Sequence, residues 1–272
     1  MYRKKSYLLV FVIIFLLSSI YVFPGLSGLS AATSTSHQKL IFFTTSTANK
    51  IILFDDAHDK PNDDDLSTNY ADFKVFVESK GYSVEALTSG PITLDKLKNY
   101  TFYILNDPNI ALDSAEIDAI KSYIQQGGRV LVVADSDTAY GSVNEIISVF
   151  GVNLTEIASA KMTLDSFSAS HYVVKNLKNV TFRLSDFKLT VNNTLAMAIA
   201  NTTTSDIGIA AFDKIGKLVV LADADPLINI NSDTNYTTLV SNILDWLSKP
   251  VLEVSFLMDD KNYKKILVFY HN

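Results

Sequence analysis

From residue 50 onward, short apolar runs alternate with segments in which apolar residues recur three and four positions apart. Short apolar runs between turn residues predict buried strands, and the three-and-four spacing predicts amphipathic helices. The predicted strands are residues 51–54, 83–87, 102–105, 130–134 and 217–222. Strands that alternate with helices are typical of βαβ units, so we expect a parallel sheet covered by helices on both faces.

Caps and glycines mark the predicted helix boundaries. A helix begins near Tyr70 and ends at Gly81, and a short one follows Thr93. Two more begin with the spacing of a capping box, in which a side chain at each end of a four-residue segment bonds the backbone of the other. These pairs are Asp113 with Glu116 and Ser142 with Glu145, and the helices end at Gly127 and Gly151. The last helical spacing covers residues 239–247, before Pro250.

Two regions depart from this alternation of strands and helices. Residues 152–212 contain short alternating segments rich in Val, Thr and Phe, which predict a β-rich insertion or an antiparallel extension of the sheet. Residues 251–272 predict two strands about a turn at 259–262, either an edge hairpin or the start of a truncated module. The predicted fold class is therefore α/β, a Rossmann-like (flavodoxin-like) three-layer sandwich with a mostly parallel sheet, a β-rich insertion and a C-terminal hairpin.

The N-terminus has the layout of an export signal. A basic cluster at residues 3–5 precedes an apolar run at 7–23, then Pro24-Gly25 and small residues up to Ala32. This predicts either a signal peptide cleaved near Ala32 or an uncleaved membrane anchor. Residues 33–49 form a Thr/Ser-rich stem, and the folded domain occupies 50–250. We expect an extracytoplasmic protein, secreted or held on the outer face of the cytoplasmic membrane.

The composition excludes several kinds of site and partner. The chain has no cysteine, which excludes disulfides and thiolate sites, and its net charge of −6 argues against nucleic acid as a partner. Six N-x-T triplets agree with an exported glycoprotein. The candidate glycosylation sites are Asn99, Asn153, Asn179, Asn192, Asn201 and Asn235.

Polar residues follow several of the predicted strands. Ligands of open α/β sheets bind outside the carboxyl ends of the strands, so these positions are the candidate ligand-binding rim. They are Asp55, Asp56, His58, Asn106, Asp107, Asp135, Ser136, Asp137, Asp223 and Asp225. Crowded carboxyl groups raise each other's pKa and call for solvent, a cation or a hydrogen-bonding ligand. The alternative is that these side chains only cap helices and form turns.

Several common catalytic and metal-binding motifs are missing from the sequence. Ser136 lies in A-D-S-D-T and not in a G-x-S-x-G elbow, and neither common phosphate-binding glycine motif is present. The loop at residues 58–65 could supply oxygen ligands to Ca²⁺, but it lacks the EF-hand spacing, so a solvated acidic loop is favoured. His58, beside carboxylates at a strand end, could act as a base or a ligand.

Four segments carry a resemblance to a known superfamily. They are IILFDDAHDK, GYSVEALTSGPITLDKLKNYTFYILNDPN, LDSAEIDAIKSYIQQGGRVLVVADSD and LVVLADADPLIN with LVSNILDWLSKP. They are similar to the class I glutamine amidotransferase-like superfamily, and more narrowly to its non-catalytic branch. That branch includes membrane-associated proteins of unknown function, gliding-motility transporter accessory proteins and an intraflagellar transport subunit.

The resemblance bears on activity. The enzymes' cysteine nucleophile corresponds to Asp135-Ser136, and their His-x-Glu pair to Asp223-Ala224-Asp225, so the resemblance implies no amidotransferase activity. The branch's elements map onto Asp55, His58, Asp223 and Asp225 and imply a binding or assembly role. We therefore expect a binding module for a saccharide, small ligand or partner subunit, beside a transporter or envelope assembly. The alternatives are a carbohydrate or ester hydrolase that uses the Asp/His rim, and a purely structural surface domain.

Overall fold

The computed structural model describes residues 50–59, 65–249, 251–258 and 264–271. The predicted export signal, the stem and the turn at 259–262 lie outside these ranges. Within them, no helix is both long enough and apolar enough to cross a membrane.

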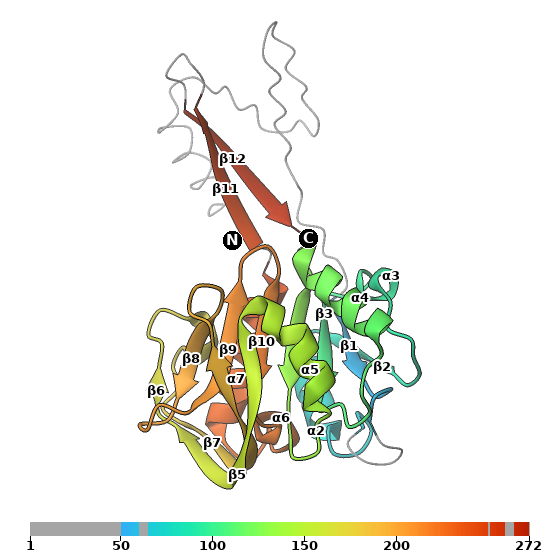
Figure 1. Ribbon diagram of the computed structural model, residues 1–272, viewed down its shortest axis with the longest axis vertical. Coiled ribbons are helices and arrows are strands. Elements are labelled where there is room, and N and C mark those ends of the chain that lie inside the picture. The colour runs from blue at the N-terminus through green and yellow to red at the C-terminus, as the bar shows by residue number, and fades with distance from the viewer. Residues whose placement is uncertain (1–49, 60–64, 250, 259–263, 272) are drawn as a thin grey trace, which may run out of the picture. The chain divides into compact units, whose positions relative to one another are not determined.

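Five parallel strands form the part of the sheet that the sequence predicted (Figure 1). They are β1 (Ile51–Asp55), β2 (Ser83–Leu87), β3 (Phe102–Asn106), β4 (Arg129–Val133) and β10 (Lys217–Leu221). Their order is β2-β1-β3-β4-β10, and every neighbouring pair is parallel. The first four positions repeat the 2-1-3-4 order of flavodoxin-like sheets. The predicted α/β fold class is confirmed.

Helices cover both faces of these strands. The described helices are α2 (Ala71–Ser79), α3 (Leu94–Leu97), α4 (Ser114–Gln125), α5 (Tyr140–Ile147), α6 (Asp225–Ile228) and α7 (Thr234–Ser248). Figure 1 shows α4 and α5 in front of the sheet and α2 and α7 behind it. Phe54 of β1 packs on the rings of Tyr70 and Phe73 at centroid distances of 5.2 and 6.0 Å, which places α2 over that face. Both faces of the central strands are therefore buried.

Of the two predicted capping boxes, one is present and one is not. Asp113 and Glu116 form the predicted capping box at the start of α4. The box predicted at Ser142 is wrong, because α5 begins two residues earlier, at Tyr140, with no side-chain cap on Ala139. Ser142 instead donates its hydroxyl to the Ala139 carbonyl at 3.0 Å and accepts the N–H of Leu112 at 3.3 Å. Its hydroxyl thus joins α5 to the segment that leads into α4.

The β-rich region extends the same sheet with antiparallel strands. These are β5 (Val152–Leu164), β6 (Ser166–Phe167), β7 (Val180–Val191), β8 (Met197–Asn201) and β9 (Ile207–Asp213). They join through β9, which pairs antiparallel with β10, and the ten strands make one sheet. The β-rich region is therefore both an insertion in the chain, between α5 and β10, and an antiparallel extension of the sheet. The long β5–β7 ribbon reaches the end of β10, where the Ser185 hydroxyl donates to the Ala222 carbonyl at 3.1 Å.

The predicted hairpin is present at the C-terminus. Strands β11 (Val251–Met258) and β12 (Lys264–His271) pair antiparallel along their whole length and form a separate two-stranded sheet.

Candidate functional site

The carboxyl ends of the parallel strands bring the predicted rim residues to one edge of the sheet. Asp55 and Asn106 are the last residues of β1 and β3, and Asp135 and Asp223 follow the ends of β4 and β10 by two residues. Parallel neighbours end on the same side, so this edge carries all four. The amino edge carries the turn between β9 and β10.

The sheet divides these residues between its two faces, because successive side chains of a strand point to opposite faces. Phe54 faces α2, so Asp55 faces α4. Ile104 pairs with Phe54 in register, so Asn106, two residues further along β3, lies on the face of α2. The rim is therefore two groups of side chains and not one.

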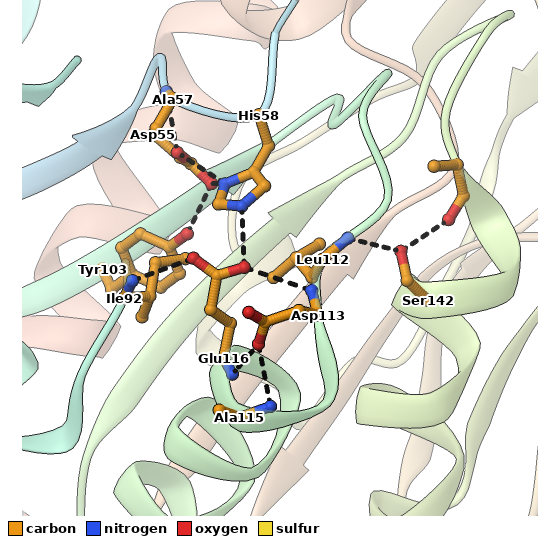
Figure 2. Close-up of polar contacts among 11 residues, drawn as sticks. Asp55, Ala57, His58, Ile92, Tyr103, Leu112, Asp113, Ala115, Glu116 and Ser142 are labelled. Carbon is orange, nitrogen blue, oxygen red and sulfur yellow. Dashed lines mark hydrogen bonds and ion pairs between the residues drawn. The ribbon is translucent and has the colours of Figure 1, made fainter. Parts of the chain in front are cut away.

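The first group is a buried network on the α4 face, which we call the His58 clamp and define as Asp55, His58, Tyr103 and Glu116 (Figure 2). Nδ1 of His58 lies 2.9 Å from Oδ2 of Asp55, and Nε2 lies 3.1 Å from Oε2 of Glu116. The Tyr103 hydroxyl donates to Oδ2 of Asp55 at 2.7 Å. Asp55, His58 and Glu116 are only 1%, 7% and 5% exposed, so the clamp is closed to solvent.

Backbone donors complete the clamp. Oε1 of Glu116 accepts the N–H of Ile92 at 3.0 Å, and Oε2 accepts the N–H of Asp113 at 3.1 Å (Figure 2). Oδ1 of Asp55 accepts the N–H of Ala57 at 3.0 Å. The clamp thus joins the loop after β1, the segment before α3 and the first turn of α4.

The protonation of His58 follows from its partners. Burial disfavours the charged imidazole, but the hydrogen bonds and charges of Asp55 and Glu116 outweigh it and raise the pKa of His58 to about 9. At neutral pH both ring nitrogens therefore carry protons and donate to carboxylates. An imidazolium held in this way has no lone pair with which to act as a base.

Sequence reasoning missed two members of the clamp. Glu116 was assigned only to the capping box and Tyr103 only to a buried strand. Both assignments are correct but incomplete, since the second role of each depends on which helix covers β1. Strand alternation was the available signal, because it places Tyr103 on the same face as Asp55.

The second group begins with Asp107, a buried residue at φ 31° directly after β3. Its Oδ1 accepts the N–H of Asp135 at 3.1 Å and the hydroxyl of Thr138. These bonds hold the turn between β4 and α5. Ser136 and Asp137 are exposed on this turn.

Asp223 is a buried carboxyl at the end of β10. It is 3% exposed, and its Oδ1 accepts the N–H of Asp225 at 2.8 Å. Burial, reinforced by the charges of Asp135, Asp225 and Asp186, raises the pKa of Asp223 to about 8. It is thus mostly protonated at neutral pH. On the same face of the sheet, Oδ1 of Asn106 is buried and accepts no hydrogen bond from the described residues.

Asp56 belongs to neither group. It is half-buried and accepts the N–H of Leu66 at 3.3 Å. Burial raises its pKa to about 6, against that hydrogen bond and with the help of the charges of Asp65, Asp55 and Asp59. It therefore holds the end of the loop before α2.

A polar cavity of about 350 Å³ adjoins Asp225. It is lined by Lys161, Thr181, Arg183, Ser232, Asp233 and Tyr236, which come from β5, β7 and the start of α7. Arg183 links it to the rim, since its backbone N–H donates to Oδ2 of Asp225. No sequence motif identified these residues, because they are far apart in the chain.

The Ca²⁺ site that the sequence analysis considered is not seen in the described part of the chain. There, no three His, Asp or Glu side chains are grouped so as to hold a metal ion. Residues 60–64 of the acidic loop, proposed as a source of Ca²⁺ ligands, lie outside it.

The candidate glycosylation sites differ in accessibility. Asn99, Asn179 and Asn192 are exposed, and Asn153, Asn201 and Asn235 are partly buried. Asn235 is held on both sides, since its amide donates to Asp233 at 3.0 Å and its oxygen accepts the N–H of Lys178 at 3.2 Å. Oδ1 of Asn192 accepts the N–H and hydroxyl of Thr194, at 3.1 and 2.8 Å.

Residues 68–244 match the model of a domain family of unknown function, DUF4350. The chain belongs to this family. No curated protein matches it significantly.

Solved structures show where the DUF4350 domain stands among known folds. It is similar to the mmIFT52 N-terminal domain, with a TM-score of 0.63 and 16% identity over 73% of this chain and 97% of that one. It is also similar to the cytoplasmic protein STM3548 from Salmonella typhimurium, with a TM-score of 0.53 and 16% identity over 72% and 98%. A glutamine amidotransferase from Thermotoga maritima matches with a TM-score of 0.47 and 10% identity over 73% and 97%. At these identities the likeness shows the fold alone, and that fold agrees with the α/β architecture predicted from the sequence.

Proposed function

We propose that this protein is an exported binding module of the cell envelope, which engages a ligand or partner subunit at the carboxyl edge of β4 and β10. The observation that carries the proposal is the environment of Asp223. Its carboxyl is buried next to three other acidic side chains, and no cationic side chain of the described residues forms an ion pair with it.

Folding does not require this carboxyl. Its one hydrogen bond, accepted from Asp225, closes a turn that an asparagine oxygen would close equally well. A buried acid that opposes stability is typical of a functional position, where binding and not folding accounts for the residue. The unpartnered Oδ1 of Asn106 on the same face also favours binding at this edge.

The His58 clamp argues against the alternative of a hydrolase. That alternative needs His58 as an acid, a base or a metal ligand, but both of its ring nitrogens are engaged by buried carboxylates. Ser136, at the position of the amidotransferase nucleophile, has neither the elbow nor an adjacent histidine among the described residues. Binding is therefore the better-supported role.

Export and anchoring belong to the same proposal. Their support is the basic and apolar N-terminal pattern together with the N-x-T triplets. Glycosylation and association with a transporter or envelope assembly follow from that location. The fold carries no such information, since it also occurs in a protein described as cytoplasmic.

Site-specific photo-crosslinking in intact cells tests both parts. We would place a photoreactive amino acid at Ser136, which is exposed on the carboxyl edge, and at Lys214, which is exposed in the β9–β10 turn on the amino edge. The full chain is expressed in each case, and external protease reports its location.

The expected result is protease-accessible protein with a discrete adduct from position 136 and none from position 214. Adducts of equal yield from both positions would contradict a specific edge. Protein that is protected from external protease until the membrane is opened would contradict export.

A further inference from the structure

We infer that the cavity beside Asp225 binds the carboxylate of an acidic saccharide, a ligand class that rests on the proposed binding function. The cavity is lined by two cations, three hydroxyl groups and one carboxylate, contributed by Lys161, Arg183, Thr181, Ser232, Tyr236 and Asp233. Its volume of about 350 Å³ lies at the lower end of the range for small-molecule sites, which is suitable for one sugar residue.

The two cations lack the partners expected in an acidic protein. Nη1 of Arg183 donates to Asn229 at 3.0 Å and Nη2 to Ser232 at 3.2 Å, and both acceptors are neutral. Within the part of the chain that the structure describes, neither Arg183 nor Lys161 forms an ion pair. The protein as a whole carries a net charge of −6. Two cationic side chains that line one cavity without an ion pair of their own are therefore able to bind an oxyanion.

The Arg183 guanidinium is held in place for this role. Asn229 and Ser232 fix its plane, and only two of its five N–H groups are used in these bonds. An arginine positioned in this way is suited to a planar carboxylate, which accepts two parallel hydrogen bonds.

The charges around the cavity favour a carboxylate over a phosphate monoester. Lys161 and Arg183 are offset by the carboxylates of Asp233 in the lining and Asp225 beside it, so the site has no surplus positive charge to hold a dianion. A phosphate monoester, at about −1.5 to −2 at neutral pH, would therefore be repelled more than a single carboxylate. Oδ1 of Asp233 caps α7, and Asp233 also lines the cavity, where its carboxylate can accept hydrogen bonds from sugar hydroxyls.

A saturation-transfer NMR titration of the full chain tests the inference with three probes. These are methyl glucuronide, the matched neutral methyl glucoside, and glucose 6-phosphate. The variants are Lys161→Ala, Arg183→Ala and Arg183→Lys, and Lys214→Ala is the control that removes an exposed lysine far from the cavity. Lys161 is exposed on β5, so its removal leaves the core intact.

We expect saturable binding of the glucuronide and none of the glucoside. Arg183→Ala should weaken binding about tenfold or more, Lys161→Ala by several fold, and Lys214→Ala not at all, since about 1.4 kcal/mol corresponds to tenfold in affinity. The affinity of Arg183→Lys should fall between those of wild type and Arg183→Ala, because lysine keeps the positive charge but cannot form two parallel hydrogen bonds to a carboxylate.

Three results would overturn the inference: equal binding of the glucoside, tighter binding of the phosphate ester, or glucuronide affinity unchanged by both cavity variants. Adducts from position 136 together with no glucuronide binding would overturn the ligand class and leave the binding function standing. The absence of both the adducts from position 136 and glucuronide binding would contradict the binding function as well.

Discussion

The His58 clamp makes a quantitative prediction about stability and pH. Replacing His58 with Gln removes the positive charge between Asp55 and Glu116 and keeps one hydrogen-bond donor. The pKa of His58 is raised from 6.5 to about 9, and at about 1.4 kcal/mol per pH unit this corresponds to about 3 kcal/mol of stabilisation. That figure agrees with the roughly 3–5 kcal/mol lost when one partner of a buried ion pair is removed.

The sign of the pH dependence follows from the direction of the shift. A pKa that is higher in the folded state stabilises the protein fully below the unfolded value of 6.5, and this stabilisation disappears as the pH rises through about 9. Above that pH the neutral imidazole, like glutamine, offers one donor and one acceptor to the two carboxylates. The stability of wild type and His58→Gln should therefore differ by about 3 kcal/mol at pH 6 and converge near pH 9.5.

Urea unfolding followed by the fluorescence of Trp246, which is the only tryptophan and is buried, measures this difference. Subtracting the free energy of unfolding of the variant from that of wild type cancels the contribution of other titrating groups such as Asp223. His171→Gln is the matched control, because burial and the charge of Lys217 lower the pKa of His171 to about 4. Only the unfolded-state imidazole, with a pKa of 6.5, titrates between pH 6 and 9.5, so the effect of His171→Gln should change by less than about 1 kcal/mol and in the direction opposite to that of His58→Gln. A His58→Gln effect that stays constant over this range would refute the charged clamp.

Three further predictions concern single side chains. Asp223→Asn should raise the free energy of unfolding at pH 8 by at least about 1 kcal/mol and have no such effect at pH 4. The reason is that a carboxyl group with a raised pKa opposes folding more and more as the pH rises from about 3.8 to 8. Thermal melts at both pH values measure this. Tyr103→Phe should cost about 1.5–3 kcal/mol in urea unfolding, because a buried carboxylate loses a donor, and a neutral result would contradict that bond. In an N-glycosylating host that exports the chain, site-resolved mass spectrometry should find Asn192 modified and Asn235 unmodified, because the amide nitrogen of Asn235 is bonded to Asp233 and, among the described residues, only the amide oxygen of Asn192 is bonded. The reverse pattern would contradict the hydrogen bonds at the start of α7.

The parallel part of the fold could be predicted from sequence because its signals are local. Apolar runs and the glycines at positions 81 and 151, both with positive φ, mark strand and helix ends without reference to distant residues. The β-rich region remained ambiguous because its pairing is not local: whether β9 joins β10 depends on contacts that no short pattern encodes. The cap at Ser142 failed for a similar reason, since its hydroxyl bonds the segment before α4.

The candidate site was predictable to the same extent. Strand direction places Asp55, Asp135 and Asp223 at one edge, and this needs only a parallel sheet. The separation of Asp55 from Asn106 follows from strand alternation combined with register, and register becomes known only in the structure. The polar cavity could not be predicted, because Lys161 and Arg183 lie on two strands of a long antiparallel ribbon and meet the start of α7 only in the folded chain.

The two faces of the edge differ in how their charges are neutralised, and this difference separates structure from function. On the α4 face, the carboxylates of Asp55 and Glu116 share an internal cation, and all are sealed from solvent. Near the end of β10, burial favours the protonated form of Asp223, and among the described residues the Arg183 guanidinium forms no ion pair. A charge that finds its counterion within the chain stabilises the fold, whereas one left unmatched at a strand end is available to a ligand. The binding surface is therefore expected where folding has left charges uncompensated, at the ends of β4 and β10 and in the cavity beside them.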